Sequence, residues 1–495
     1  MHKYPHFSIT TNPNRSRVGR TGILVLLCWS IGWLAGCELI GDDPTPGVSD
    51  VTDIKYEEHI QAIFNQRCVS CHAGQNPSAG LRLEGWTWLI QGSDFGEAII
   101  PFSSEDSRMV KMLTSTSITP HPKDVGKSTL TDDEIGLLKR WIDEGAVGPL
   151  GASPFASSLN LLYVTHESSP KITVFDTDAW LVVRSLDLQD YGFSDRARAY
   201  HVAVEPDGSY FYVSIGSARA SDKQVVAKFN RQNQLLAQYE MPNPGLLALH
   251  PNQNVLYVSR TAESSDPRSL VELRRTDFLP LHIPMSFAGN RALAMRPFGD
   301  FLYTSSMDVD QLAIVDLSNL TVAYVDITGI RQGFNQFAVG PAGNRMWGTG
   351  VFSNTVTLFD ISNPSKIVQR QSLFTDGSPF DLTFIPNGSK VYVTVPTGNR
   401  IKVINTILEL VEADIQHQGL QEPLGISTTQ SGAYVFVSSR NQGGIYQARR
   451  VFEGEGAPGT ISVIDTATDK VIKVIEVGSK PGTMGSRIVV PTFTQ

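Results

Sequence analysis

The sequence is poor in cysteine. It has four cysteines in 495 residues. Cys28 and Cys37 lie near the N-terminus, which leaves only Cys68 and Cys71 for the rest of the chain. A framework of structural disulfides is therefore excluded. The remaining pair, separated by two residues, needs an explanation of its own.

The sequence also lacks a strong excess of charge of one sign. It has 41 Lys and Arg against 49 Asp and Glu, a net charge of −8, and no segment in which Lys and Arg cluster. A nucleic-acid-binding face needs such a cluster, so we expect no nucleic-acid partner. Hydrophobic residues make up 41% and charged residues 18%, a balance that argues against wholesale disorder. The length of 495 residues predicts two or more domains.

Acidic residues are absent from positions 1–36, where four basic residues precede an apolar run. The run covers residues 23–34. It is too short to span a bilayer comfortably and is typical of the hydrophobic core of a signal peptide. We therefore expect residues 1–36 to be a signal peptide that directs export.

The end of this segment, Leu34-Ala35-Gly36-Cys37, resembles the lipobox of bacterial lipoproteins. The resemblance implies cleavage before Cys37, lipidation of that cysteine, and a membrane-anchored protein in the periplasm or at the cell surface. Glu38 follows, rather than the aspartate that usually retains lipoproteins at the inner membrane, which favours the outer membrane. An ordinary signal peptide with a chance cysteine is the alternative. Residues 37–52, rich in Pro, Gly and Asp, are expected to form a flexible tether.

Cys68, Cys71 and His72 form the motif C-x-x-C-H, the attachment motif of c-type haem. The two thiols bond to the two vinyl groups on one edge of the haem, and the adjacent histidine is placed to bind the iron. A zinc site would need further ligands, and no other cysteine remains to supply them. A redox C-x-x-C of the thioredoxin type would need a βαβ context, which is absent. The motif therefore predicts one covalently bound haem c.

Helices are predicted on both sides of this motif. Residues 54–67 have apolar side chains three to four positions apart. Residues 131–134 form a capping box, from which a helix is expected to continue through Trp141 and end at Gly145. Trp141 is expected to pack in the core, which in a cytochrome c includes the haem.

Residues 53–147 resemble the cytochrome c domains common in planctomycetes and related bacteria. Those domains share a first helix, C-x-x-C-H, a Gly-Leu-x-Leu stretch and a closing motif with Trp-Ile and Gly-Ala; here the last two are residues 80–83 and 130–146. The resemblance implies a small α-helical cytochrome c domain.

One position departs from the family pattern. The family usually supplies the second protein ligand of the iron from a Met-Pro pair before the last helix, and here His121 stands in that place between two prolines. His121 is therefore the candidate distal ligand. Met109 or Met112, on a predicted helix, is the alternative, and an open or water-bound iron is a third.

From residue 158 to the C-terminus the sequence repeats. An aromatic residue, usually within Tyr-Val-Thr or Tyr-Val-Ser, recurs every 44 to 49 residues, and most copies follow a Pro-x-Gly turn. A period near 45 residues with about four strands per unit is typical of a β-propeller. Seven aromatics predict seven blades: Tyr163, Tyr212, Tyr257, Tyr303, Trp347, Tyr392 and Phe436. The repeats resemble the YVTN-type family of seven-bladed propellers of exported bacterial proteins.

The first repeat lacks an inner strand. We expect the apolar run at residues 487–490 to supply it and so to close the ring. Repeats 2, 3 and 7 are longer than the others between their second and third strands, most of all at residues 440–459. Insertions that emerge on one face often mark a binding face, although a tolerated surface loop is the alternative.

Three polar residues are the candidates for a site in the propeller channel. His201, Gln336 and Asp381 each lie five residues before the turn that follows an inner strand, so we expect them on one side near the channel mouth. A solvated channel mouth is the alternative interpretation.

These observations favour an exported, lipid-anchored monohaem cytochrome c that transfers electrons to or from an unidentified redox protein, with the propeller as a docking platform. Acidic residues near the cytochrome core, among them Glu105, Asp106 and Glu134, would favour a basic partner unless they form an ordinary solvated face. One alternative is a haem-coupled oxidoreductase with its active site in the propeller channel. Another is a surface-binding propeller protein. An electron carrier is favoured over a stand-alone enzyme, but the sequence does not decide whether the protein is an enzyme.

Overall fold

The computed structural model describes residues 51–115, 121, 130–219, 221–261, 268–449, 452 and 456–487. All described residues belong to one compact unit, Val48–Gln495. The predicted signal peptide, Cys37 and the apolar run at 488–490 lie outside the described residues. No helix in the described part of the chain is long and apolar enough to cross a membrane.

Short helices make up the first part of the described chain, called here the helical part (residues 51–115, 121 and 130–147). They are a π-helical turn η2 (Tyr56–Ile60), α1 (Gln61–Arg67), the 3-10 turn η3 (Ser78–Gly80), α2 (Trp86–Ile90), α3 (Arg108–Thr114) and α4 (Asp132–Asp143).

The helix predictions on both sides of the cysteine motif are confirmed. The first helix begins with the π-helical turn before α1. At the start of α4, Thr131 Oγ1 accepts a hydrogen bond from the Glu134 backbone N–H, and Glu134 Oε2 accepts one from the Thr131 N–H at 2.7 Å. The helix ends before Gly145, whose φ of 102° is a conformation that favours glycine.

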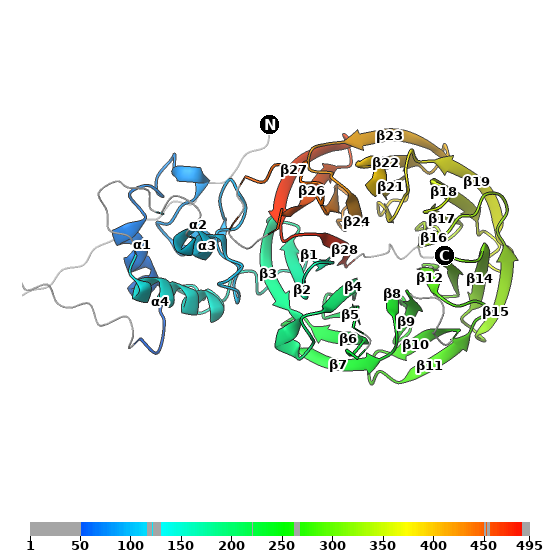
Figure 1. Cartoon of the computed structure of the whole chain (residues 1–495), viewed down its shortest axis with the longest axis horizontal. Coiled ribbons are helices and arrows are strands. Elements are labelled where there is room, and N and C mark those ends of the chain that lie inside the picture. The colour runs from blue at the N-terminus through cyan, green and yellow to red at the C-terminus, as the bar shows by residue number, and fades with distance from the viewer. Residues whose placement is uncertain are drawn as a thin grey trace, which may run out of the picture. The chain divides into compact units, whose positions relative to one another are not determined.

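The second part is a seven-bladed β-propeller, as predicted (Figure 1). Its described strands form seven four-stranded antiparallel sheets, arranged around a ring with one edge strand of each sheet near the centre. A small helical region followed by an all-β propeller is therefore the fold of the chain.

The strands of each blade, from the innermost outward, have the following bounds: β28 (Pro481–Ser486), β1 (Leu161–His166), β2 (Lys171–Asp176) and β3 (Leu181–Asp187) in blade 1; β4 (Ala197–Val204), β5 (Tyr210–Ser217), β6 (Val225–Asn230) and β7 (Leu235–Glu240) in blade 2; β8 (Pro244–Leu249), β9 (Val255–Arg260), β10 (Ser269–Arg274) and β11 (Pro280–Pro284) in blade 3; β12 (Asn290–Met295), β13 (Phe301–Ser306), β14 (Gln311–Asp316) and β15 (Thr321–Asp326) in blade 4; β16 (Phe334–Val339), β17 (Arg345–Gly350), β18 (Thr355–Asp360) and β19 (Val368–Phe374) in blade 5; β20 (Leu382–Phe384), β21 (Lys390–Val395), β22 (Arg400–Asn405) and β23 (Leu410–Gln416) in blade 6; and β24 (Pro423–Thr428), β25 (Tyr434–Ser439), β26 (Gly459–Asp465) and β27 (Lys470–Val477) in blade 7. Two 3-10 turns, η4 (Leu188–Tyr191) and η5 (Pro396–Gly398), lie between strands.

A C-terminal strand closes the ring, but the prediction of residues 487–490 for it was wrong. The strand is β28, which pairs with β1 and places Gly485 opposite Tyr163. The inner strand needs small residues because neighbouring blades approach each other there: a Cβ atom at Gly485 would collide with the backbone carbonyl of Val202. The apolar character of residues 487–490 was therefore not enough to identify the closing strand.

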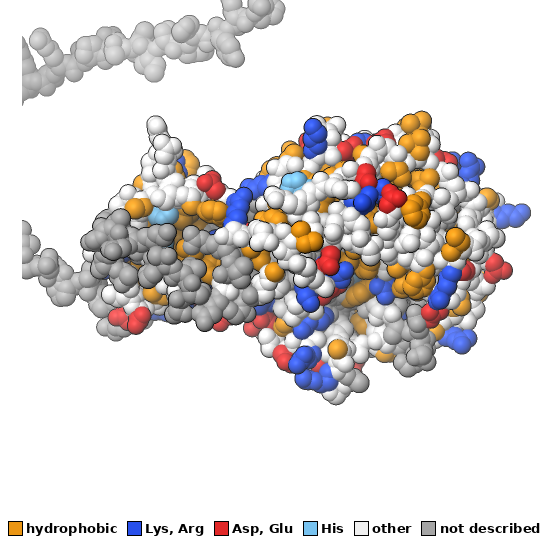
Figure 2. Space-filling view, turned by 45° about the horizontal axis from the view of Figure 1, so that its top comes forward, with side chains coloured by type: hydrophobic (Ala, Val, Ile, Leu, Met, Phe, Trp, Pro, Cys, Tyr) orange, Lys and Arg blue, Asp and Glu red, His pale blue; other side chains and the backbone are white. Residues whose placement is uncertain are grey.

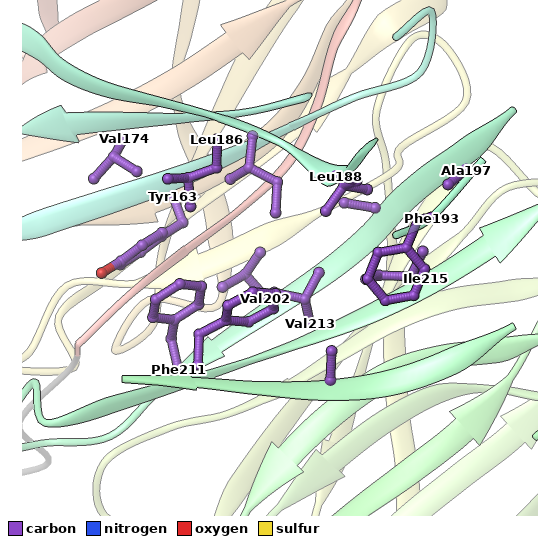
Figure 3. Close-up of a cluster of buried hydrophobic side chains, with 14 of the residues drawn as sticks. Tyr163, Val174, Leu186, Leu188, Phe193, Ala197, Val202, Phe211, Val213 and Ile215 are labelled. Carbon is purple, nitrogen blue, oxygen red and sulfur yellow. The ribbon is translucent and has the colours of Figure 1, made fainter. Parts of the chain in front are cut away.

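The recurring aromatics lie on the second strand of each blade, and all seven are at most 2% exposed. Between blades 1 and 2, the rings of Tyr163 on β1 and Phe211 on β5 stack with their centres 4.3 Å apart, and Val202 and Val213 pack in the same cluster (Figure 3). The aromatic of the repeat therefore belongs to the core of the propeller.

The hydroxyl that ends the Tyr-Val-Thr or Tyr-Val-Ser motif links neighbouring blades. Ser259 Oγ donates to the Arg291 carbonyl at 3.0 Å, and Thr394 Oγ1 donates to the Leu424 carbonyl at 2.9 Å. Thr349 and Ser438 make the same kind of bond to the next blade. Each such hydrogen bond contributes on the order of 1 kcal/mol. The motif thus serves propeller assembly.

Candidate functional site

A tight turn at the end of α1 brings the cysteine motif together. The backbone N–H groups of Cys71 and His72 both donate to the Cys68 carbonyl, at 3.1 and 3.0 Å. Cys71 is exposed and Cys68 is half-buried, whereas His72 is 8% exposed. The two cysteines are therefore more accessible to solvent than the buried His72.

The environment of His72 favours a neutral ring. Burial lowers the pKa of His72, an effect that the carbonyls of Leu81 and Ser78 partly offset. Its Nδ1 atom is buried and makes no hydrogen bond of normal geometry. A neutral imidazole is the form of histidine that binds metal ions.

The structure brings His121 to His72, although the two residues are far apart in sequence. Their ring centres are 5.9 Å apart and the ring planes are inclined by 51°. Two imidazoles that share one metal ion through bonds of about 2 Å have ring centres roughly 6 Å apart. This distance would allow His72 and His121 to hold a single haem iron between them.

The other residues near the motif fit a haem group as well. Met109 and Met112, the alternative ligands, lie half-buried on α3, where Met109 packs against the helical core. Trp141 on α4 is 1% exposed, its ring centre lies 5.5 Å from that of Tyr56, and its Nε1 donates to the Val147 carbonyl at 3.0 Å. Its place in the core agrees with the expected packing role.

A haem iron needs only two protein ligands, because the porphyrin supplies the others. In the described part of the chain no group of three or more His, Cys, Asp or Glu side chains is arranged to hold a metal ion. His72 and His121, with Cys68 and Cys71 next to His72 in the sequence, are therefore the residues that would hold a haem.

An ion pair that the sequence analysis missed ties α1 to α4. Arg67, the residue before Cys68, bonds Glu134 Oε1 through Nη2 at 3.1 Å and Nε at 3.2 Å, and both side chains are largely buried. Glu134 is also the acid of the capping box. One carboxylate therefore fixes the start of α4 against the end of α1, where the cysteine motif begins.

Two of the acidic residues expected on the surface of the helical part are bound inside the protein. Glu134 holds Arg67, and Asp106 accepts hydrogen bonds from Lys171 Nζ at 2.8 Å and Ser185 Oγ at 2.6 Å. Burial opposes the ionisation of Asp106, but Lys171 and Ser185 outweigh it and lower the pKa. On the face shown in Figure 2, acidic and basic side chains are interspersed, with no large patch of one sign.

Two of the three candidate residues of the propeller channel lie on inner strands, His201 on β4 and Gln336 on β16, and Asp381 directly precedes the inner strand β20; all three form hydrogen bonds with backbone groups. His201 Nδ1 accepts from the Leu247 N–H of the next blade at 3.3 Å. Asp381 Oδ2 accepts from the Ile426 N–H of the next blade, also at 3.3 Å. Among the described residues no hydrogen bond joins any two of the three candidates. Burial lowers the pKa of His201 to about 4 and raises that of Asp381 to about 7.

Gln336 differs from the other two candidates, because its Oε1 accepts from the N–H of the adjacent Phe337 at 3.1 Å, within its own strand. Beside it, Asn335 bridges blades by accepting from Arg291 Nε at 2.7 Å and donating to the Phe380 carbonyl at 2.8 Å. The contacts of His201, Asp381 and Asn335 therefore support a role in holding neighbouring blades together rather than in binding a substrate.

The longest insertion has a partner within the chain. It lies between β25 and β26, as predicted, and its Arg449 donates through Nη1 to the Asp94 carbonyl at 2.8 Å. The guanidinium of Arg449 also lies 5.2 Å from the ring centre of Phe95. The insertion expected to mark a binding face thus contacts the helical part of its own chain.

Known proteins are similar to each of the two parts of the chain. Residues 68–119 match the family model described as planctomycete cytochrome C, a family that implies haem c binding. None of the curated proteins compared with the chain matches it.

Solved structures resemble the propeller at low sequence identity. A functionally unknown protein from Desulfotomaculum acetoxidans has a TM-score of 0.52 and 15% identity over 66% of this chain and 99% of its own. A putative 6-phosphogluconolactonase from Bacteroides fragilis has a TM-score of 0.50 and 14% identity over 68% of this chain and 99% of its own. A protein from Lactobacillus plantarum has a TM-score of 0.52 and 13% identity over 66% and 98%. At these identities the likeness concerns the fold alone. The chain therefore joins a segment that matches the planctomycete cytochrome c family to a seven-bladed β-propeller.

Proposed function

We propose that this protein is an exported, lipid-anchored c-type cytochrome with one haem, which transfers electrons to or from another protein. The observation that carries the proposal is the pair of histidine rings, His72 and His121, whose centres are 5.9 Å apart beside Cys68 and Cys71. When bound, haem c supplies reversible one-electron transfer.

Each residue of the motif has its own role in binding the haem. Cys68 and Cys71 would hold the haem covalently, and His72 and His121 would both bind its iron. With two histidines bound, the iron would have no position for a substrate. This arrangement supports an electron carrier over an enzyme that binds substrate at the iron, and the bonds of His201 and Asp381 to neighbouring blades give no support to a channel active site.

The proposed location rests on the N-terminal sequence. Lipidation of Cys37 would anchor the mature chain, and Glu38 favours the outer membrane. In bacteria the C-x-x-C-H motif receives haem outside the cytoplasm, which agrees with export. The variant Cys37→Ala should leave the protein unlipidated and released from membranes. Membrane association of that variant equal to the wild type would count against the anchor.

The haem ligation is tested by spectroscopy of the purified holoprotein. The pyridine haemochrome assay should give one haem c per chain, and the oxidised protein should lack the far-red absorption band of a sulfur ligand. The variant His121→Met should introduce that band and raise the reduction potential, because methionine ligation gives a higher potential than histidine ligation.

A second variant tests the same ligand by access to the iron. His121→Ala should leave one iron position without a protein ligand, so carbon monoxide should bind the reduced variant and not the wild type. A sulfur band or carbon monoxide binding in the wild type would show that His121 is not the distal ligand, and would assign that place to Met109, Met112 or an open site.

A further inference from the structure

A cavity of about 340 Å³ lies between the helical part and blades 1 and 7. This volume is at the lower end of the range for small-molecule sites, roughly 300–1,000 Å³. His166 lines the cavity and is neutral there, because burial lowers its pKa. The charged side chains of the walls are three acids and three bases: Glu97, Asp106, Arg108 and Lys111 from the helical part, Lys171 from blade 1 and Glu476 from blade 7. The walls therefore carry both signs of charge with no excess of either.

Two of the three acids already have close partners within the protein. Asp106 accepts a hydrogen bond from Lys171 Nζ at 2.8 Å, so these two charges neutralise each other. Glu476 Oε1 accepts hydrogen bonds from the Arg449 N–H at 2.7 Å and from the Tyr446 hydroxyl at 3.2 Å, both in the blade 7 insertion. These contacts assign Asp106 and Glu476 to the structure of the cavity wall.

The guanidinium of Arg108, on α3, has donors that the described residues do not use. Its side chain is only 18% exposed, and its Nε atom is buried without a hydrogen-bond partner among them. Glu476 lies 3.7 Å from Arg108 Nη2, an ion pair that is too long for a hydrogen bond. Buried donors that remain unbonded cost free energy, and a carboxylate matches the planar guanidinium with two parallel hydrogen bonds. Arg108 therefore points to a ligand that carries a carboxylate.

Glu97 lines the same cavity and has acceptor capacity to spare. Its Oε2 accepts a hydrogen bond from the Val182 N–H at 3.2 Å. In the described part of the chain no other residue donates a hydrogen bond to this carboxylate, and no Lys or Arg forms an ion pair with it. An ionised carboxylate has about four acceptor positions, so Glu97 can bind a ligand that carries an ammonium group.

We propose that this cavity binds a small zwitterion, an amino acid, whose carboxylate is bound by Arg108 and whose ammonium group is bound by Glu97. Lys111 follows Arg108 by three residues on α3, so both cations lie on one side of the helix and favour the carboxylate there. A dianion would be repelled by Glu97 and Glu476, and a dication by Arg108 and Lys111, whereas a ligand with one charge of each sign complements the walls. This inference does not rest on the proposed electron-transfer function.

The test is a binding screen on the full-length holoprotein by isothermal titration calorimetry. The probes are the standard amino acids and 4-aminobutanoate. We expect at least one probe to bind with a Kd below about 1 mM. Two analogues of that probe, one without the amino group and one without the carboxylate, should each bind at least about ten-fold more weakly, because each leaves a charged group of the cavity without its partner. Absence of binding by every probe, or equal binding of the analogues, would overturn the proposal.

Two variants assign the two ends of the ligand. Arg108→Gln and Glu97→Gln should each weaken binding of the amino acid by at least about ten-fold. Glu97→Gln should no longer distinguish the amino acid from the analogue without the amino group, and Arg108→Gln should no longer distinguish it from the analogue without the carboxylate. Thermal unfolding and the haem spectrum show whether each variant is folded, and the analogues test the wild type even if a variant is not.

Matched controls remove the same kinds of charge from the helical part outside the cavity. Glu105→Gln changes an exposed acid, and Arg140→Gln changes an arginine of α4 that is 45% exposed; neither residue lines the cavity. Both variants should bind the amino acid as the wild type does. Binding weakened as much by these two changes as by Glu97→Gln and Arg108→Gln would place the ligand elsewhere and overturn the proposal.

Discussion

The helical part and the propeller achieve stability in different ways. The propeller divides its core into several clusters, each shared by strands of neighbouring blades, and repeats the same contacts around the ring. The helical part has one cluster, gathered from short helices, which lies beside His72 and includes Trp141. If one contact between blades is lost, the equivalent contacts between the other blades remain. The contacts in the core of the helical part are not repeated elsewhere in that part. We therefore expect changes in the helical part to affect the haem site, and changes in the propeller to affect global stability with the haem site intact.

The largest expected effect is the removal of both thiols, in the double variant Cys68→Ser and Cys71→Ser. Covalent haem should be lost completely, because Cys68 and Cys71 are the only cysteines among the described residues, and haem-stained denaturing gels would measure the loss. The propeller should still melt cooperatively in calorimetry. Ser70→Ala, a change between the two cysteines, is the matched control and should keep its haem. Loss of the propeller transition in the double variant would contradict the separation of the two parts.

A smaller effect is expected from Gly485→Ala in the closing strand β28. The added Cβ atom meets the backbone of Val202, which cannot move as a side chain can, so the free energy of unfolding should fall by about 1–3 kcal/mol. Thermal unfolding measures this, and the haem spectrum should not change. Gly216→Ala is the control, since nothing lies within 4 Å of its added atom. Equal stability of the two variants would argue against close packing at the closure.

In the helical part, Thr131→Ala removes the cap of α4. The helix loses the hydrogen bond from the Glu134 N–H to Thr131 Oγ1, a change that costs about 1 kcal/mol. Because Glu134 also holds Arg67 beside the cysteine motif, we expect faster hydrogen exchange in α1 as well as in α4. Thr131→Ser should restore both. An effect confined to α4 would show that the cap and the motif are not coupled.

The smallest effect is expected from Thr394→Val, which removes one hydroxyl contact between blades 6 and 7. The bond of Thr394 Oγ1 to the Leu424 carbonyl is buried, and its loss should cost about 0.5–1.5 kcal/mol in chemical denaturation. Thr394→Ser should recover most of the stability. A loss larger than that of Gly485→Ala would mean that the hydroxyl bonds, rather than the closing strand, dominate the propeller.

Sequence periodicity was enough to predict the propeller because each blade repeats the same burial pattern. Tyr257, Tyr392 and their equivalents recur at nearly constant spacing, since every second strand presents its aromatic to the same kind of core. The capping box at Thr131 was predictable for a similar reason, because both partners lie within one helical turn. The motif Cys68-x-x-Cys71-His72 is also local, so the candidate haem site could be named without a structure.

Contacts between distant segments were not predictable in this way. We predicted the wrong residues for the closing strand because we relied on an apolar run. The backbone of Val202 lies so close to position 485 that a small residue, Gly485, is required there. The partner of the blade 7 insertion, Asp94, lies more than 300 residues away in the chain. The length of this insertion predicts that it extends beyond the blade, but it does not predict which part of the protein the insertion contacts.

The amino-acid sequence by itself determined the order of the two parts, the number of blades and the identity of the haem-binding motif, because repetition and short spacing carry that information. Only the tertiary structure decided that the rings of His72 and His121 lie close together, that His201 and Asp381 bond to neighbouring blades, and that Asp106 is paired with Lys171. The physical reason is that the state of a polar side chain depends on burial and on partners from remote segments, and these exist only once the chain has folded.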